Sequence, residues 1–535
     1  MIKELTELVT LTENAIPNHE NLLNFLSKQN RDVLKLFHAV QANSFRTEAE
    51  AVDKAKVGAR TKFRQIAREL LRCLEQMVLM IDFDKQLLDE LNHARIRGFQ
   101  LMATVKSLAP FACKNGAKRA AEELLKIGQQ YARPEFVVEA AKVLMDHASI
   151  ASDDPEIFNH YLSLYQTYSE WRLVEERILI YLNKVKLPYI KKKVLSYENI
   201  AFAQQSVSEF EQYVEVIPSH AFHIAFYSLK SKMYMIGASY KEAAKTHEEA
   251  ITYFNTRPYS CSAALNIFYY FEIANCVYLA QYERGGEYFQ KAIGQALIGS
   301  DNWFNTLELG FYLRMHEQHW SAAAMIYHTA TKHKRFNVLR DTKREIWYIL
   351  GAYLYIMQKM TSAVLPEGMV PKVKSSRFRN EIKDFTQDKM GMNVAILAAE
   401  VLLNFVEEKD DVLWDRIAAL EKYRERYLRN NEQTHRSQLF IKILSILSRY
   451  NYSCDKFLEK AAPYLSEMHK SPLQLSNQAH ELEIVPYEHL VHAIAGQLNR
   501  RRGHKSEMPG WFQMGEVKVI NNTLLTEDQG GRAAK

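Results

Sequence analysis

Glycine and proline are scarce in this chain, and cysteine is rare. The 535 residues include 19 glycines, 13 prolines and 5 cysteines, and no proline occurs between Pro258 and Pro366. So few helix breakers, together with abundant Ala, Leu, Glu, Lys and Gln, favour an almost entirely helical chain. The cysteines are scattered without a CxxC pair, which argues against a disulfide framework or a thiolate zinc site and suits a reducing compartment.

Segments that would take the chain to or through a membrane are also missing. No window contains 18 uninterrupted apolar residues, so we expect no membrane span. The first residues, MIKELTELVTLTEN, carry acids and polar residues where a signal peptide would be apolar. We therefore expect a cytoplasmic protein with no membrane partner. The net charge of +6, from 69 basic and 63 acidic side chains, is too small to indicate nucleic-acid binding by itself.

Signatures of catalysis and of metal or cofactor binding are absent from the sequence as well. It contains no GxSxG, GxxxxGK[ST] or HExxH motif. His316-x-x-His319 and His489-x-x-His492 offer two ligands each, whereas zinc needs three or four ligands that converge. We expect no catalytic residues, no metal and no cofactor, and keep an enzyme with a site assembled in space as a minor alternative.

A pattern recurs in the middle of the chain. Fragments that begin at Tyr240, Tyr282 and Trp320 place an aromatic, a small residue, a ring and an alanine at offsets 0, 3, 7 and 10, at intervals of 42 and 38 residues. On a helix these positions share one face, so small residues admit a second helix while rings fill the space beside them. The recurrence indicates stacked helical hairpins. The expected packing positions are Tyr240, Ala243 and Ala250, Tyr282, Gly285 and Ala292, and Trp320, Ala323 and Ala330.

These fragments resemble tetratricopeptide (TPR) repeats, in which an aromatic residue opens the second helix of each hairpin. Leu309-Gly310 is similar to the family's leucine–glycine step, although it lies one residue too far from Trp320. The intervals also exceed the family's usual length of about 34 residues. The resemblance implies an all-α fold, an α-solenoid of antiparallel helical hairpins, with a concave face that binds peptides or partner proteins.

The chain divides into four parts separated by one conspicuous loop. Residues 361–376 contain two prolines, a glycine and a serine pair, which break the helical period. A degraded form of the recurring pattern at Trp171 indicates that the array begins before residue 200. The expected parts are an N-terminal helical module over 1–110, TPR-like repeats over 111–360, a C-terminal helical extension or cap over 377–500, and a flexible tail over 501–535.

An arginine stripe is the sharpest local feature of the N-terminal part. Arg60, Arg64, Arg68 and Arg72 recur every fourth residue on one side of a helix whose other side is apolar. Like charges at this spacing cost about 0.2–0.5 kcal/mol per pair. The stripe either meets phosphates or an acidic partner, or forms a solvated face paired with acids such as Glu48.

Two functions follow from these features. The main hypothesis is a non-catalytic scaffold or adaptor that binds a peptide or partner protein on a helical-repeat surface. The alternative is a regulator that binds nucleic acid or another polyanion through the arginine stripe. The identity of the partner and the oligomeric state stay open.

Overall fold

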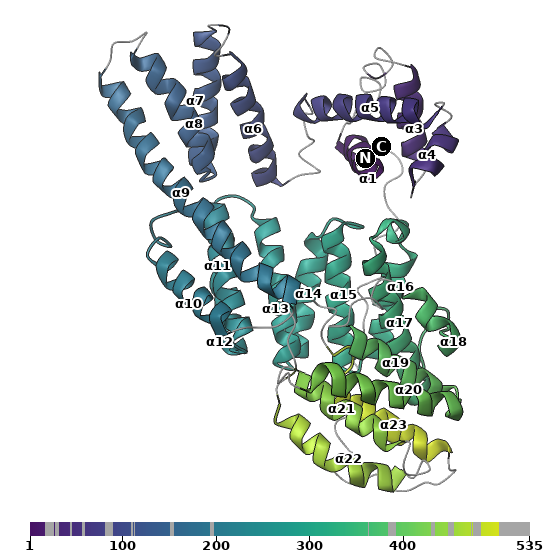
Figure 1. Cartoon of the computed structure of the whole chain (residues 1–535). Coiled ribbons are helices and arrows are strands. Elements are labelled where there is room, and N and C mark those ends of the chain that lie inside the picture. The colour runs from purple at the N-terminus through teal and green to yellow at the C-terminus, as the bar shows by residue number, and fades with distance from the viewer. Residues whose placement is uncertain are drawn as a thin grey trace, which may run out of the picture.

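A computed structural model gives the fold of the chain (Figure 1). It describes residues 1–15, 26, 31–42, 45, 47–55, 59–80, 89–108, 111, 113–149, 155–192, 197–361, 363–382, 392–429, 434–447, 454–471, 473 and 483–501. Within these residues every element is helical and no strand occurs, so the fold is all-α as expected. None of the described helices combines the length and the apolar character that crossing a membrane requires. The expected tail lies outside the described residues, apart from Arg501.

The first helices form a module with its own core. They are α1 (Ile2–Ala15), α3 (Arg31–Ala42), α4 (Glu48–Ala55) and α5 (Arg60–Met80). Apolar residues recur every three or four positions along α5, so that Phe63, Ala67 and Leu70 are buried on one side of it. The buried residues of this core run from Leu5 to Met77 and form a cluster separate from the rest.

Helices α6 to α9 make a second packed group. They are α6 (Glu90–Leu108), α7 (Lys114–Gln130), α8 (Pro134–His147) and α9 (Pro155–Lys192). Leu101 of α6 shares a core with Leu124 of α7 and with Phe136 and Leu144 of α8. Helix α6 therefore packs with α7 and α8, and none of its residues belongs to the buried core of the N-terminal module.

The second group ends in a single long helix. α9 has 38 residues, and Trp171 lies in its middle. The pattern at Trp171 therefore lies within a helix, unlike the three later fragments, which open one. Only the later part of α9 contributes fully buried residues, among them Ile178 and Leu182.

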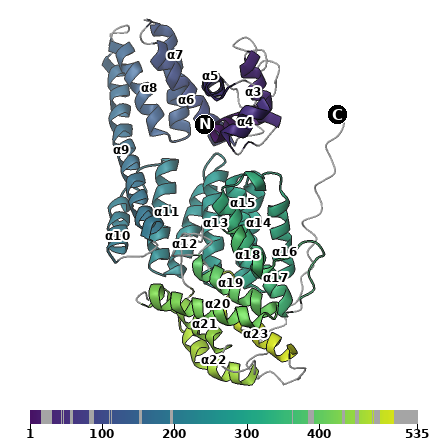
Figure 2. The same ribbon diagram turned by 45° about the vertical axis from the view of Figure 1, so that its right-hand side comes forward.

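Antiparallel helices stacked side by side form the centre of the molecule (Figures 1 and 2). Consecutive helices contact each other throughout this part, as in a solenoid. The serine before α11 and the serine before α15 cap these helices, because their hydroxyl oxygens accept hydrogen bonds from the N–H groups of Phe222 and Trp303. The helices are α10 (Tyr197–Glu211), α11 (His220–Ile236), α12 (Tyr240–Asn255), α13 (Ser262–Tyr278), α14 (Tyr282–Gln295), α15 (Asp301–His316), α16 (Trp320–Lys332) and α17 (Asp341–Thr361).

Several hairpins share the same turn. The middle residue of each turn has a positive φ, at Ala132, Ala238, Ala280, Gln318 and Glu408. The next residue then donates its N–H to a carbonyl five positions back, for example from His319 to Arg314 at 2.9 Å. This bond satisfies one of the carbonyls that a helix end leaves without a partner.

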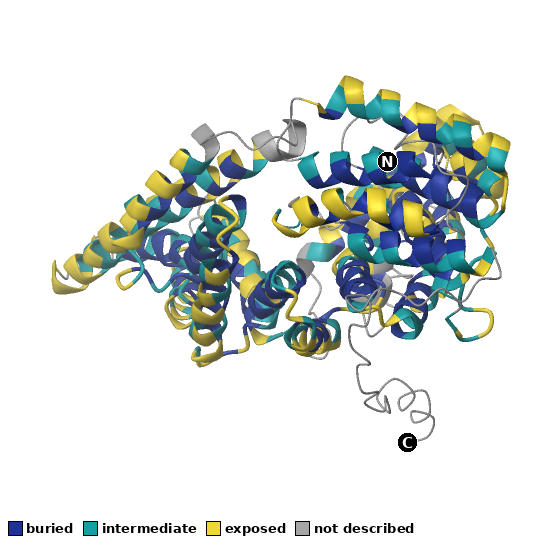
Figure 3. Ribbon diagram, turned by 90° about the horizontal axis from the view of Figure 1, so that it is seen from below, coloured by how far each residue is buried: buried dark blue, intermediate teal, exposed yellow. Residues whose placement is uncertain are grey.

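The C-terminal helices pack below the array. They are α18 (Ser375–Phe378), α19 (Asn393–Val406), α20 (Asp410–Tyr423), α21 (His435–Ile446), α22 (Cys454–His469) and α23 (Tyr487–Arg501). The loop at 361–376 is tied down at its far end, because the N–H and the hydroxyl of Ser375 donate to Glu407 at 2.9 and 2.7 Å. Buried residues from α9 to α23 belong to one continuous core, and exposed residues lie on the outer sides of the helices (Figure 3).

Candidate functional site

In the recurring pattern, each aromatic residue at offset 0 is the first residue of the second helix of a hairpin. Tyr240 opens α12, Tyr282 opens α14 and Trp320 opens α16. The small residues that follow lie buried in the seams between helices, and each alanine among them is 0% exposed. These small residues are Ala243 and Ala250 in α12, Gly285 and Ala292 in α14, and Ala323 and Ala330 in α16.

The ring at offset 7 of the pattern packs on a glycine of the next hairpin. A Cβ atom on Gly310 would lie 2.2 Å from a ring carbon of Phe289. A Cβ atom on Gly351 would lie 2.6 Å from the hydroxyl oxygen of Tyr327. Only glycine leaves room for such an approach, so each ring sits in a notch of the following helix. The sequence drew attention to Gly310 but gave no sign of Gly351.

His247 occupies the ring position of the first fragment, and it meets polar groups. Its Nδ1 lies 2.6 Å from a carboxylate oxygen of Glu272, and its Nε2 lies 2.6 Å from the hydroxyl oxygen of Ser231. Arg284 lies 2.9 Å from the other carboxylate oxygen of Glu272. This chain of contacts joins α11, α12, α13 and α14.

The order of these side chains is that of a serine–histidine–acid triad, but their surroundings do not suit catalysis. Ser231 is 2% exposed, and His247 and Glu272 are 0% exposed. A hydrolase must bring a substrate carbonyl to the serine and provide donors for the developing oxyanion, and these closed seams admit no substrate. The nearby thiol of Cys276 is also enclosed, and burial raises its pKa to about 12. We interpret the row of contacts from Ser231 through His247 to Glu272 as structural, because it holds neighbouring helices together.

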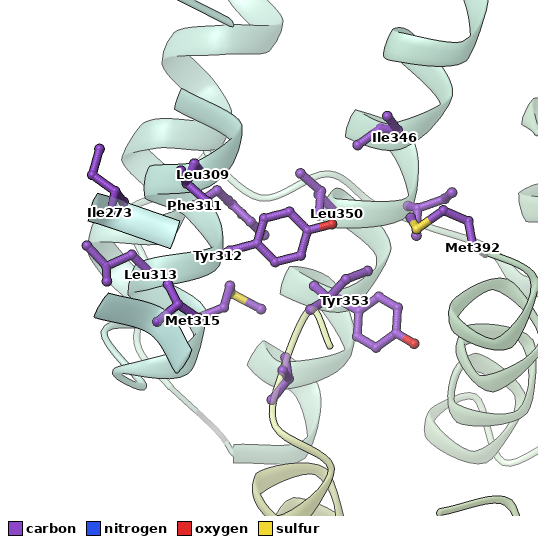
Figure 4. Close-up of a cluster of buried hydrophobic side chains, with 14 of the residues drawn as sticks. Ile273, Leu309, Phe311, Tyr312, Leu313, Met315, Ile346, Leu350, Tyr353 and Met392 are labelled. Carbon is purple, nitrogen blue, oxygen red and sulfur yellow. The ribbon is translucent and has the colours of Figure 1, made fainter. Parts of the chain in front are cut away.

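Helix α15 offers no open face over the middle of its length. Every residue from Thr306 to Leu313 of α15 is buried. A run longer than two turns covers all directions around a helix, because one turn takes about 3.6 residues. Apolar side chains of α15 and α17 meet here, because the rings of Phe311 and Trp347 have centroids 6.2 Å apart. Figure 4 shows other members of this cluster, among them Tyr312 and Leu350. An open concave groove, which the resemblance implies, is therefore not available along this part of α15.

Residues 483–501 lie against the end of α15, where His316 contacts Glu483. A buried arginine, Arg436, holds this segment in place. Arg436 is 3% exposed, and its guanidinium lies 2.6 and 3.0 Å from the carboxylate oxygens of Glu483. Glu488 accepts a further hydrogen bond at 2.7 Å, and the carbonyl of Met468 accepts one at 2.8 Å. The ring of Tyr487 stacks on Phe440 with centroids 4.2 Å apart.

The histidine pairs do not form a ligand set. Nε2 of His316 donates to the carbonyl oxygen of Glu483, and burial lowers the pKa of His316 to about 4. Nε2 of His489 lies 3.2 Å from the side-chain nitrogen of Gln318. Across the described residues, no group of three or more His, Cys, Asp or Glu side chains is placed to hold a metal ion.

Part of the arginine stripe is neutralised within the N-terminal module. Nε of Arg64 lies 2.6 Å, and Nε of Arg60 3.1 Å, from one carboxylate oxygen of Glu48. Hydrogen bonds from both arginines lower the pKa of Glu48. Arg68 and Arg72 are exposed and make no ion pair within the described part of α1 to α5. Only half of the stripe is therefore free to meet a polyanion.

Three comparisons with known proteins gave no match. The chain matched no protein-family model, no curated protein sequence and no solved structure. Function must therefore be inferred from the arrangement of its own residues.

Proposed function

We propose that this protein is a non-catalytic scaffold or adaptor of the TPR-like kind, and that it binds a peptide or a partner protein on its helical-repeat surface. The observation that supports this most is the repetition of one packing device, in which a ring of one hairpin meets a glycine of the next at Phe289 and Gly310 and at Tyr327 and Gly351. Hairpins that contact only their neighbours create an extended surface, and such surfaces serve recognition in repeat proteins.

The buried polar groups also favour binding over catalysis. Ser231, His247 and Glu272 contact one another inside the seams. One histidine of each pair, His316 and His489, is engaged in a contact with another segment of the chain. All but one of the cysteines are buried free thiols. Free thiols suit a reducing compartment, and we include a cytoplasmic location in this proposal.

Affinity purification of the full chain, with mass spectrometry of bound proteins and a stain for bound nucleic acid, tests the proposal. We expect a defined protein partner that forms a stoichiometric complex when both purified components are mixed and measured by light scattering. Recovery of nucleic acid alone would favour the polyanion alternative. In that case Arg68→Glu/Arg72→Glu should weaken binding, and Arg60→Glu/Arg64→Glu should weaken it less, because Glu48 already pairs with Arg60 and Arg64.

A further inference from the structure

Exposed aliphatic side chains gather on two neighbouring loops of the array. Leu297 is 73% exposed and Ile298 is 69% exposed in the loop between α14 and α15. Val338 is 47% exposed in the loop between α16 and α17. Adjacent aliphatic residues this exposed are costly in water and often mark an interaction site. We call residues 296–300 together with 332–340 the loop edge.

The two loops form one surface. Gly299 has a φ of 80°, and a Cβ atom there would lie 2.5 Å from a ring carbon of His333 and 3.3 Å from Cδ of Arg335. The ring of His333 also lies against Trp303, with centroids 5.0 Å apart. The turn at Gly299 therefore holds Leu297 and Ile298 beside the second loop.

The loop edge is strongly basic. Its four cations are exposed, and none of them makes an ion pair in the part of the chain that the structure describes. The nearest acids along the chain are Asp301, which is exposed, and Asp341, which pairs with Arg344. Desolvation, Lys334 and Arg335 together lower the pKa of His333. The four cations are Lys332, Lys334, Arg335 and Arg340.

This combination of groups selects among ligands. Nucleic acid is bound through phosphates and stacked bases, and aliphatic side chains such as Leu297 and Ile298 provide no stacking surface. A flat anionic bilayer would meet the N-terminal helices first, because α1 and α3 to α5 lie beyond this end of the hairpins in both views (Figures 1 and 2). A narrow protein segment can reach the loop edge without meeting the N-terminal helices first.

We infer that the loop edge docks an acidic segment of a partner protein that carries leucine-like side chains beside its carboxylates. The aliphatic side chains of the segment would cover Leu297 and Ile298, and its carboxylates would pair with Lys334 and Arg335. Charge pairs of this kind steer association and fix the register, while burial of the aliphatic groups supplies affinity. This inference rests on the proposed function and names the surface and the chemistry of the partner.

Fluorescence anisotropy with labelled helical peptides of about 15 residues tests the inference on the full chain. The probe carries Glu and Leu on one face, and its two matched peptides replace all Glu by Lys or all Leu by Ser. We expect the Glu/Leu probe to bind at least about tenfold more tightly than either matched peptide. Leu297→Ser/Ile298→Ser and Lys334→Glu/Arg335→Glu should each weaken its binding at least about tenfold.

Two variants elsewhere on the surface provide matched controls. Val364, which is 96% exposed in the 361–376 loop, is changed to Ser, and exposed Lys372 in the same loop is changed to Glu. Both should bind the probe as the unchanged chain does, and circular dichroism should show all variants folded. Equal binding by the loop-edge variants would overturn the inference. So would binding of anionic vesicles or duplex DNA that depends on Leu297 and Ile298 while the peptide fails to bind.

The failure of this inference differs from failure of the proposed function. If a partner identified by affinity purification binds the loop-edge variants and the unchanged chain equally, the inference is wrong and the scaffold proposal stands. If the unchanged chain binds no protein partner, the scaffold proposal itself is wrong.

Discussion

Single residues without bulk decide how closely successive hairpins approach. Gly310 accepts the ring of Phe289, and Gly351 accepts the ring of Tyr327. A methyl group at either glycine would occupy space that the ring already fills. Glycine is normally unfavourable inside a helix by about 0.5–1 kcal/mol relative to alanine, so the contact must offset this cost.

Gly310→Ala is expected to lower the free energy of unfolding by about 2 kcal/mol or more, because the added methyl overpacks the contact with Phe289. Gly294→Ala is its matched control, since a Cβ atom at Gly294 meets nothing within 4 Å. The control should raise stability by about 0.5–1 kcal/mol, because alanine favours the helix more. Urea titration measures both free energies of unfolding. Equal losses of stability in the two variants would contradict the claim that Gly310 leaves room for the ring of Phe289.

Two buried tyrosines in the core between α15 and α17 allow a second test at this scale (Figure 4). The hydroxyl of Tyr312 is enclosed and has no hydrogen-bond partner among the described residues. The hydroxyl of Tyr353 donates to the carbonyl of Ala395 at 2.9 Å. Tyr312→Phe should stabilise the protein by about 1 kcal/mol, and Tyr353→Phe should destabilise it by about 1 kcal/mol. Thermal melts of the pair check the opposite signs, and shifts in the same direction would count against this account.

At the scale of elements, sequence patterns predicted what lies within a hairpin better than what lies between hairpins. The starts of α12, α14 and α16 could be read from the sequence, because an aromatic and small residues share one helical face. The same pattern occurs at Trp171 without marking a helix start, because Trp171 lies inside the long helix α9, which continues on both sides of it. Gly351 was missed because its partner ring lies on the preceding hairpin.

The packing of residues 483–501 could not be predicted either, because it also depends on residues far apart in the sequence. It depends on Glu483 and Tyr487, which meet Arg436 and Phe440 across a separation of almost fifty residues. Such contacts leave no periodic signal. The pairing of Glu48 with Arg64 was, by contrast, one of the two interpretations that the sequence had raised, because both residues lie on neighbouring predicted helices.

We expect the stability of the contact between His316 at the end of α15 and Glu483 before α23 to depend on pH. Burial lowers the pKa of His316 to about 4, whereas an unfolded histidine titrates near 6.5. The unfolded chain therefore binds more protons between these values, and stability falls as the pH drops through this window. Lowering the pH from 7 to 5.5 should cost about 1 kcal/mol through His316 alone.

His316→Gln removes this titration while keeping a donor for the carbonyl of Glu483. Its loss of stability between pH 7 and pH 5.5 should be smaller than that of the unchanged chain by about 1 kcal/mol. His220 and His223 also have pKa values lowered to about 4 by burial, and they remain in both proteins. Urea midpoints at the two pH values make the comparison, and identical losses would show that His316 is protonated without cost.

For the molecule as a whole, residues 483–501, which include α23, link the array to the C-terminal helices. We call these residues the strap. Arg500 donates to the carbonyl of Met360 in the last turn of α17, and Arg501 donates to the carbonyl of Phe405 in the last turn of α19. Cations at these positions favour the negative ends of the helices. The strap begins at the buried ion pairs of Arg436.

Arg436→Met should destabilise the C-terminal helices by about 3–5 kcal/mol, because it leaves the buried carboxylate of Glu483 without its cation. Lys460→Met is the control, since Lys460 pairs with exposed Glu459 and the change should alter stability by less than about 0.5 kcal/mol. Hydrogen exchange should show early opening of residues 483–501 in the Arg436 variant. Unchanged exchange there would mean that the ion pairs do not hold the strap.

The central claim is that small residues in the seams stack the hairpins into one array whose outer surface is available to a partner. Ala323 of α16 is 0% exposed, whereas Thr329 on the same helix is exposed. The most direct test is the free energy of unfolding of Ala323→Arg beside that of Thr329→Arg. We predict a loss of about 3 kcal/mol or more for Ala323→Arg and less than about 0.5 kcal/mol for Thr329→Arg. An Ala323→Arg protein as stable as the unchanged chain would contradict the account.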